Sequence, residues 1–127
     1  MRVGATLESV LVFVHMTPTS GGGGPLDGVR VIELVGLGPG WFTGMLLADL
    51  GAEVVRVDRV AEARSVDRPG PATNAMHRGK RSVALDLKQA GGDEAFLGLC
   101  EGADAVIEGF RPGVAECLGL GPDDCRA

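Results

Sequence analysis

Apolar and polar positions change their spacing several times along the chain from residue 25 onward. Four runs rich in Val, Ile, Leu and Ala predict buried strands, at residues 29–35, 52–58, 82–87 and 104–110. Apolar residues at helical spacing predict helices, at residues 41–51, within 88–103 and at 111–121. A strand, a helix and a second strand within about 30 residues form a βαβ unit, in which the strands are parallel. The pattern therefore predicts an α/β fold with a parallel sheet and flanking helices.

The connections between these elements carry their own signals. The segment "GLGPGW" (36–41) follows the first strand directly and opens the first helix, and Gly51 suits the C-cap of that helix. Pro112 suits the first turn of the last helix. The polar stretch 59–81 is longer than an ordinary connection, and such loops are usually functional or mobile. The acids of "PDDCRA" (122–127) predict the start of one more helix.

Residues 1–24 follow neither pattern, and we expect them to be a disordered extension and linker ahead of a domain at 25–127. The apolar run 10–14 is too short to cross a bilayer, and no signal-peptide cleavage site follows it. The Thr, Ser and Gly residues of 17–24 are typical of a flexible linker, and Met16 could be the true start. Without a reliable targeting signal, the cytoplasm is the default location.

Charge narrows the classes of partner. The chain of 127 residues suits one domain, and its net charge of −5 argues against a general binder of nucleic acid or of an anionic membrane. Residues 56–88 nevertheless hold eight of the twelve basic side chains and four acids, a local charge of +4 that leaves −9 for the rest. A basic island on an acidic chain suits a small polyanion; the alternative is a solvated loop with scattered charges.

Cysteine and histidine usage predicts no metal site. Three cysteines without CxxC spacing indicate a reducing compartment and no structural zinc, and Cys100 is expected to be buried as a small apolar residue. His15 and His77 are the only histidines, and neither has a partner at ligand spacing.

The glycine-rich turn raises the question of a nucleotide. Gly36 and Gly38 supply the first two glycines of the dinucleotide fingerprint G-x-G-x-x-G, and Asp58 lies where its acid belongs. Trp41 replaces the third glycine, and Pro39 removes a backbone donor beside the expected pyrophosphate. An NADP site, which the arginine after Asp58 would suit, is therefore disfavoured.

Coenzyme A, with a 3′-phosphate and a diphosphate, is the second hypothesis. Arg59 ends the second strand at the carboxyl edge of the sheet, where ligands of open α/β folds bind. Lys80 and Arg81, beyond the polar loop, could meet the same phosphates, each charge-assisted contact contributing about 1.5–3 kcal/mol.

The turn after the fourth predicted strand adds to this hypothesis. Arg111 lies at the same edge, and Phe110 could pack against the adenine. The alternative role for Arg111 is an ion pair with Glu108 or Asp104.

Five blocks in order carry a family resemblance: "PLDGVRVIEL", "GPGWFTGMLLADLGAEVVRVDR", "RGKRSVALDLKQ", "ADAVIEGFRPGV" and "LGLGP". Together they resemble the family III CoA-transferase group (CaiB/BaiF type) from residue 25 to about 126, and most of all its α-methylacyl-CoA racemase branch. The resemblance implies a Rossmann-like large domain, a separate small domain and, in full-length members, an interlocked homodimer. It also implies an acyl-CoA as the small-molecule partner, with CoA as part of the substrate and no prosthetic group.

The resemblance also implies a CoA site by position. The implied residues lie in the turn before the first helix, at the end of the second strand, after the polar loop and after the fourth strand: Leu37, Gly38 and Pro39; Arg59; Lys80 and Arg81; Gly109, Phe110 and Arg111. Two positions depart from the family. Trp41 stands where the family commonly has Pro, and Cys117 stands where it commonly has Arg.

The resemblance implies no catalytic residue in this chain. The family's racemases use a His/Asp pair and its transferases an aspartate that takes up the acyl group, and both lie beyond the matched region. We therefore expect the CoA-binding portion of an acyl-CoA racemase that epimerises 2-methylacyl-CoA thioesters by abstracting the α-proton. The alternatives are an acyl-CoA:carboxylate CoA-transferase of the same fold, a non-catalytic CoA-binding remnant and, disfavoured, an NADP-binding Rossmann protein.

Overall fold

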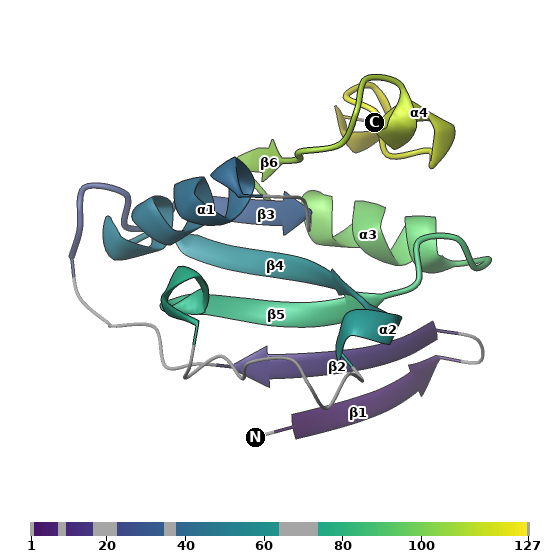
Figure 1. Ribbon diagram of the computed structural model, residues 1–127, viewed down its shortest axis with the longest axis horizontal. Coiled ribbons are helices and arrows are strands. Elements are labelled where there is room, and N and C mark those ends of the chain that lie inside the picture. Colours follow the sequence, from purple (N-terminus) through teal and green to yellow (C-terminus); the bar gives the residue numbers. More distant parts are fainter. Residues whose placement is uncertain (1, 8–9, 17–22, 35–37, 64–73, 127) are drawn as a thin grey trace.

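Six strands form one mixed sheet with the order β1-β2-β5-β4-β3-β6 (Figure 1). The computed structural model describes residues 2–7, 10–16, 23–34, 38–63 and 74–126, with residues 2–16 as backbone only. The strands are β1 (Arg2–Leu7), β2 (Val10–Met16), β3 (Arg30–Leu34), β4 (Glu53–Arg59), β5 (Lys80–Leu85) and β6 (Ala105–Ile107).

The four strands β3 to β6 are parallel, as their alternation with helices predicted. Their order, β5-β4-β3-β6, is that of a doubly wound sheet, so the predicted Rossmann-like α/β fold is confirmed. The register places Glu33 level with Arg56 and Arg59 level with Leu85. β5 begins at Lys80, two residues before the predicted start.

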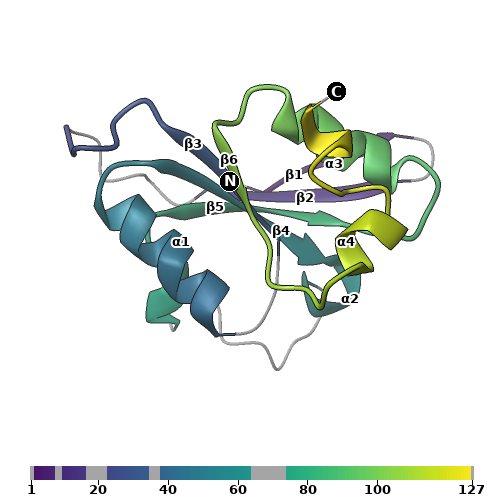
Figure 2. The same ribbon diagram turned by 90° about the horizontal axis from the view of Figure 1, so that it is seen from above.

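Helices cover both faces of the sheet (Figure 2). α1 (Pro39–Asp49) lies on one face and α3 (Gly92–Cys100) on the other. α4 (Val114–Cys117) and the 3₁₀ turn η2 (Asp124–Arg126) follow β6. No helix within the described ranges is long and apolar enough to cross a membrane.

Two short helices lie within the stretch 59–81, which the sequence predicted as one long loop. They are α2 (Val60–Ala63) and the 3₁₀ turn η1 (Ala75–His77), while residues 64–73 lie outside the described ranges. The side chain of Asn74 accepts a hydrogen bond from the Met76 amide at 3.1 Å and so caps η1. Helices this short are not visible as a period of apolar residues, which is why the pattern did not predict them.

The amino-terminal hairpin differs from expectation. Residues 1–24 were predicted to be disordered, whereas β1 and β2 pair with each other, and β2 pairs antiparallel to β5, with Phe13 level with Ala84. The physical reason lies in β5, whose outer edge would otherwise present unpaired backbone groups. The Thr/Ser/Gly segment 17–22 lies outside the described ranges.

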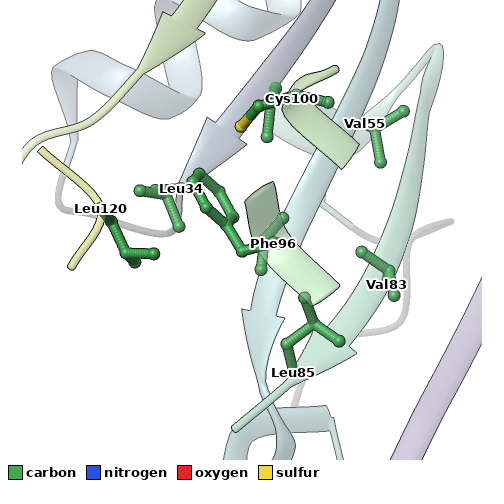
Figure 3. Close-up of a cluster of buried hydrophobic side chains, with 9 residues drawn as sticks. Leu34, Val55, Val83, Leu85, Phe96, Cys100 and Leu120 are labelled. Atoms are coloured by element: carbon green, nitrogen blue, oxygen red, sulfur yellow. The ribbon is translucent and has the colours of Figure 1, made fainter. Parts of the chain in front are cut away.

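The main hydrophobic core lies between the sheet and α3 (Figure 3). Alternate residues of β3, β4 and β5 point to this face, so each strand contributes a pair of apolar side chains. The buried cluster consists of Ile32, Leu34, Val55, Val57, Val83, Leu85, Phe96, Cys100 and Leu120. A smaller cluster on the opposite face packs beneath α1: Val31, Ala48, Ala52 and Val54.

Truncation of the largest side chain in this core should lower the stability of the domain. Phe96 is 0% exposed, so Phe96→Ala should lower the free energy of unfolding by about 3–5 kcal/mol, as measured by urea denaturation. Val114, which is 39% exposed, provides the control, because Val114→Ala should change stability by no more than about 0.5 kcal/mol. Equal losses in the two variants would contradict this packing.

Cysteine reactivity provides an independent check of the fold. Burial raises the pKa of the Cys100 thiol to about 12, and the neighbouring Cys125 adds to the rise, whereas Cys117 is exposed. Because the thiolate is the reactive form, iodoacetamide at pH 8 should modify Cys117 more than about tenfold faster than Cys100. Peptide mass spectrometry measures both rates, and in urea they should become similar. Rapid modification of Cys100 in the folded chain would mean that α3 is not packed as described.

Candidate functional site

The carboxyl ends of the parallel strands define one edge of the sheet, marked by the arrowheads of β3, β4 and β5 (Figure 1). The order β5-β4-β3-β6 places β4 and β6 on opposite sides of β3. The connections after β3 and β6 therefore diverge at this edge, and ligands of doubly wound proteins bind in the crevice at such a switch point. Gly38 and Pro39 follow β3 and the segment Gly109–Arg111 follows β6, so these parts of the predicted site lie at this point of the fold.

The turn after β3 exposes the backbone at the start of α1. Gly38 has φ +45°, in the left-handed region that favours glycine, and Pro39 is the first residue of α1. The Phe42 amide donates to the Gly38 carbonyl at 3.3 Å, which leaves the preceding amides of the first turn without an intrahelical acceptor. Such helix ends attract anions. Leu37, predicted to contact CoA, lies outside the described ranges.

The turn after β6 brings an exposed cation to the same edge. Glu108 accepts a hydrogen bond from the Phe110 amide at 2.7 Å, which shapes the turn, and Gly109 and Arg111 are exposed. Phe110 is half-buried and packs against the core cluster on the α3 face. Among the described residues no ion pair involves Arg111. Of its two predicted partners, Glu108 accepts from the Phe110 amide, and Asp104 accepts from the Arg30 amide at 2.8 Å.

Arg59 occupies the position that the sequence predicted. It is the last residue of β4, next to the end of β3, and its side chain is exposed. In the described ranges no ion pair involves its guanidinium. Arg59 is thus an exposed cation at the carboxyl edge.

Lys80 and Arg81 are not brought to Arg59. They begin β5, level with Val54 and Val55, whereas Arg59 is level with Leu85 at the far end of the strand. Five residues of strand correspond to about 17 Å. Arg81 instead donates to Glu53 at 2.5 Å, and the ammonium group of Lys80 is buried. This basic pair was predicted to meet the phosphates because it follows the polar loop, whereas the parallel register decides which end of the strand it occupies.

Lys88 is a cation at this edge that was not predicted as a site residue. It follows β5 by three residues and is exposed, and the end of β5 is level with Arg59. Its amide is held by the Asp86 side chain at 3.1 Å, which orders the chain just beyond the strand. The sequence contained a signal for Lys88, because a cation that directly follows a predicted parallel strand lies at the carboxyl edge of the sheet. We call Arg59, Lys88 and Arg111 the carboxyl-edge cations.

A buried ion pair lies under the start of α1. Lys80 Nζ donates to Glu33 Oε2 at 2.6 Å and to the carbonyl oxygen of Trp41 at 2.9 Å. Burial raises the pKa of Glu33 and lowers that of Lys80, while their mutual hydrogen bond acts against both shifts. Gly44 of α1 packs directly on this pair, and a side chain there would overlap the Glu33 carboxylate.

A second buried polar group adjoins the ion pair on the same face of the sheet. Arg56 donates to Asp58 at 3.1 Å and contacts His77 Nδ1, while Asn74 Nδ2 lies 2.9 Å from His77 Nε2. The ring of His77 meets that of Trp41 edge-on, with 5.7 Å between centroids. Arg56 and Asp58 are two residues apart in β4, and Glu33 of β3 is level with Arg56. This spacing indicates one shared face, although the strands were predicted only as apolar runs.

The fold and the site define a class of protein. This is an open, doubly wound α/β domain with a glycine turn at its switch point and basic side chains at the carboxyl edge. A model of CoA-transferase family III matches residues 26–127, and the chain belongs to this family. The predicted family is thereby confirmed.

Relatives within the family carry different names. The chain is 51% identical over 98 residues to Alpha-methylacyl-CoA racemase of Mus musculus, which covers 77% of this chain and 24% of the racemase. It is 43% identical over 119 residues to Probable fatty acyl-CoA transferase Rv3272 of Mycobacterium tuberculosis, which covers 87% of this chain and 30% of that protein. The orthorhombic crystal structure of Rv3272 from M. tuberculosis has a TM-score of 0.70 at 40% identity, over 82% of this chain and 30% of that chain. The chain thus spans less than a third of the length of these relatives.

Two glycines of α1 provide a matched test of the buried ion pair. A Cβ on Gly44 would overlap Glu33 Oε2 and lie 2.9 Å from Lys80 Nζ, so Gly44→Ala should lower the free energy of unfolding by about 1–3 kcal/mol. A Cβ on Gly40 would meet no atom within 4 Å, and Gly40→Ala should leave stability unchanged or raise it by up to about 1 kcal/mol. Urea denaturation measures both variants. A neutral Gly44→Ala would show that the ion pair is not packed against α1.

Proposed function

We propose that this chain is the CoA-binding portion of an acyl-CoA racemase, in which the carboxyl-edge cations bind the phosphates of CoA. The observation that supports this most is that Arg59, Lys88 and Arg111 all lie at or just beyond the carboxyl ends of parallel strands of one sheet, namely β4, β5 and β6. The glycine turn lies at the same switch point. Coenzyme A carries a 3′-phosphate and a diphosphate, so three cations and a helix amino terminus suit its charge.

Each part of the edge has a role in this proposal. The backbone of Gly38 and Pro39 lies beside the adenosine, since a glycine with positive φ allows close approach. Gly109 lies on the other side of the switch point and is exposed, so its backbone, which carries no side chain, faces the ligand there. Arg81 is left out, because Glu53 binds it at the amino end of β5.

The proposal assigns no catalytic residue to this chain. Racemisation beside a thioester carbonyl needs a base that removes the α-proton and a donor that returns it on the other face. His77 does not suit this task, since its ring is buried between Arg56, Asn74 and Trp41. The domain anchors the nucleotide, and the acyl group extends away from it to groups elsewhere in the whole enzyme.

The racemase assignment is supported by 51% identity to the Mus musculus racemase. A CoA-transferase is the second candidate, because the chain is 43% identical to a probable fatty acyl-CoA transferase over 87% of its length. The racemase and the CoA-transferase can be distinguished by their products. In the enzyme that carries this domain, deuterium from solvent enters the α-carbon of a 2-methylacyl-CoA during racemisation, whereas a transferase moves CoA to a carboxylate acceptor.

The proposed site predicts a specific loss of affinity. Arg59→Ala should raise the Kd for CoA by about 10–100-fold, because a charge-assisted hydrogen bond contributes about 1.5–3 kcal/mol. Isothermal titration calorimetry with CoA measures the change. Arg78→Ala is the matched control, since it removes the same charge from the segment before β5, where Arg78 pairs with Asp49. Its Kd should stay within about twofold of the unsubstituted chain, because an exposed pair contributes little.

Titration with NADP separates the remaining alternatives. Binding of NADP in place of CoA would support a dinucleotide-binding protein and contradict the proposal. Binding of neither ligand by the folded chain would also contradict it. CoA binding without racemase or transferase activity in the whole protein would favour a non-catalytic CoA-binding remnant.

A further inference from the structure

Lys80 joins three elements through one nitrogen atom. It is the first residue of β5, and its Nζ donates to Glu33 Oε2 of β3 at 2.6 Å and to the carbonyl oxygen of Trp41 in α1 at 2.9 Å. Both members of the ion pair are buried, with 0% of Glu33 and 3% of Lys80 exposed. A charged donor inside the protein therefore holds the first turn of α1 to the sheet.

Stability alone does not explain a charged pair at this depth. Burial opposes both charges, as the raised pKa of Glu33 and the lowered pKa of Lys80 indicate. Well-packed apolar residues in place of a buried ion pair often leave stability unchanged or increase it. An apolar pair cannot donate to the Trp41 carbonyl, however. The contact with α1 is a task that does require the ammonium group.

Trp41 is held through its side chain as well. Its ring lies edge-on to His77, with centroids 5.7 Å apart and an interplanar angle of 65°. His77 in turn contacts Arg56 and Asn74, so that ring is itself fixed. The backbone and the side chain of Trp41 are thus positioned by separate contacts, three residues after Gly38.

We propose that Lys80, supported by Glu33, is a positioning residue for the CoA-binding turn. It holds the carbonyl of Trp41 and thereby sets where Gly38 and the first amides of α1 meet the nucleotide. This role rests on the proposed function and differs from that of a phosphate ligand, which the family resemblance implied for Lys80. Lys80 acts through α1 and does not touch the ligand.

The test compares three variants with the unsubstituted chain. Lys80→Met removes the donor and leaves the buried Glu33 without its cation. Glu33→Gln/Lys80→Met removes both charges, so it restores stability without restoring the bond to Trp41. Asp49→Asn/Arg78→Met is the matched control, because it removes an exposed ion pair that holds the last residue of α1 instead of the first turn.

Three measurements separate positioning from stability. They are thermal unfolding, calorimetric titration with CoA, and fluorescence. Trp41 is the single tryptophan and the chain contains no tyrosine, so the emission reports on this turn alone.

We expect Lys80→Met to melt at a lower temperature and to bind CoA about tenfold more weakly. Glu33→Gln/Lys80→Met should melt close to the unsubstituted chain yet keep a Kd raised about tenfold, which corresponds to about 1.4 kcal/mol. Its Trp41 emission should be shifted in the absence of ligand. The Asp49→Asn/Arg78→Met control should retain the original Kd and emission.

Two results would overturn the inference in distinguishable ways. If the Glu33→Gln/Lys80→Met variant melts normally and binds CoA as tightly as the unsubstituted chain, Lys80 is not a positioning residue, although CoA binding stands. If the unsubstituted chain does not bind CoA, the proposed function fails and the positioning role fails with it. Should Lys80→Met alone not fold, the double variant decides by the same criteria.

Discussion

The hydrogen-bonded register of β3, β4 and β5 decides which charged side chains share a surface in this domain. Lys80 is level with Val54, and five residues later Leu85 is level with Arg59. Cations at the start of β5 therefore belong to one end of the sheet, and those that follow β5 belong to the other. This separation, about 17 Å along the strand, puts Arg59 and Lys88 at the carboxyl edge, where Arg111 follows β6, and leaves Arg81 at the other end of the sheet.

The two faces of the sheet are unlike because alternate residues of the strands differ in kind. On the α3 face β3, β4 and β5 each contribute apolar side chains to one continuous core around Phe96. On the α1 face the residues change from apolar Val31 and Val54 to charged Glu33 and Arg56 toward the carboxyl edge. Buried charges need partners, and these come from α1, β5 and η1, so the polar cluster forms only when all of these elements are in place.

This cluster joins the sheet to the turn at the proposed site. Pro39 and Gly38 define the local shape of the turn, whereas the position of the turn over the sheet depends on contacts that Trp41 makes with Lys80 and His77. The resemblance implied Pro at the position of Trp41, and the structure accommodates the indole edge-on against His77. The departure thus adds a side-chain contact next to the backbone contact.

The sequence by itself determined the alternation of strands and helices, the glycine turn, and the cations at Arg59 and Arg111, because strand period, helix period and turn chemistry are local properties. It did not predict η1 or the hairpin of β1 and β2, which are too short or depend on an open sheet edge. Only the tertiary structure decided that Lys80 lies buried against Glu33 while Lys88 reaches the carboxyl edge. Both are basic residues close to β5, and their roles differ because strand register and burial are set by partners far away in the chain.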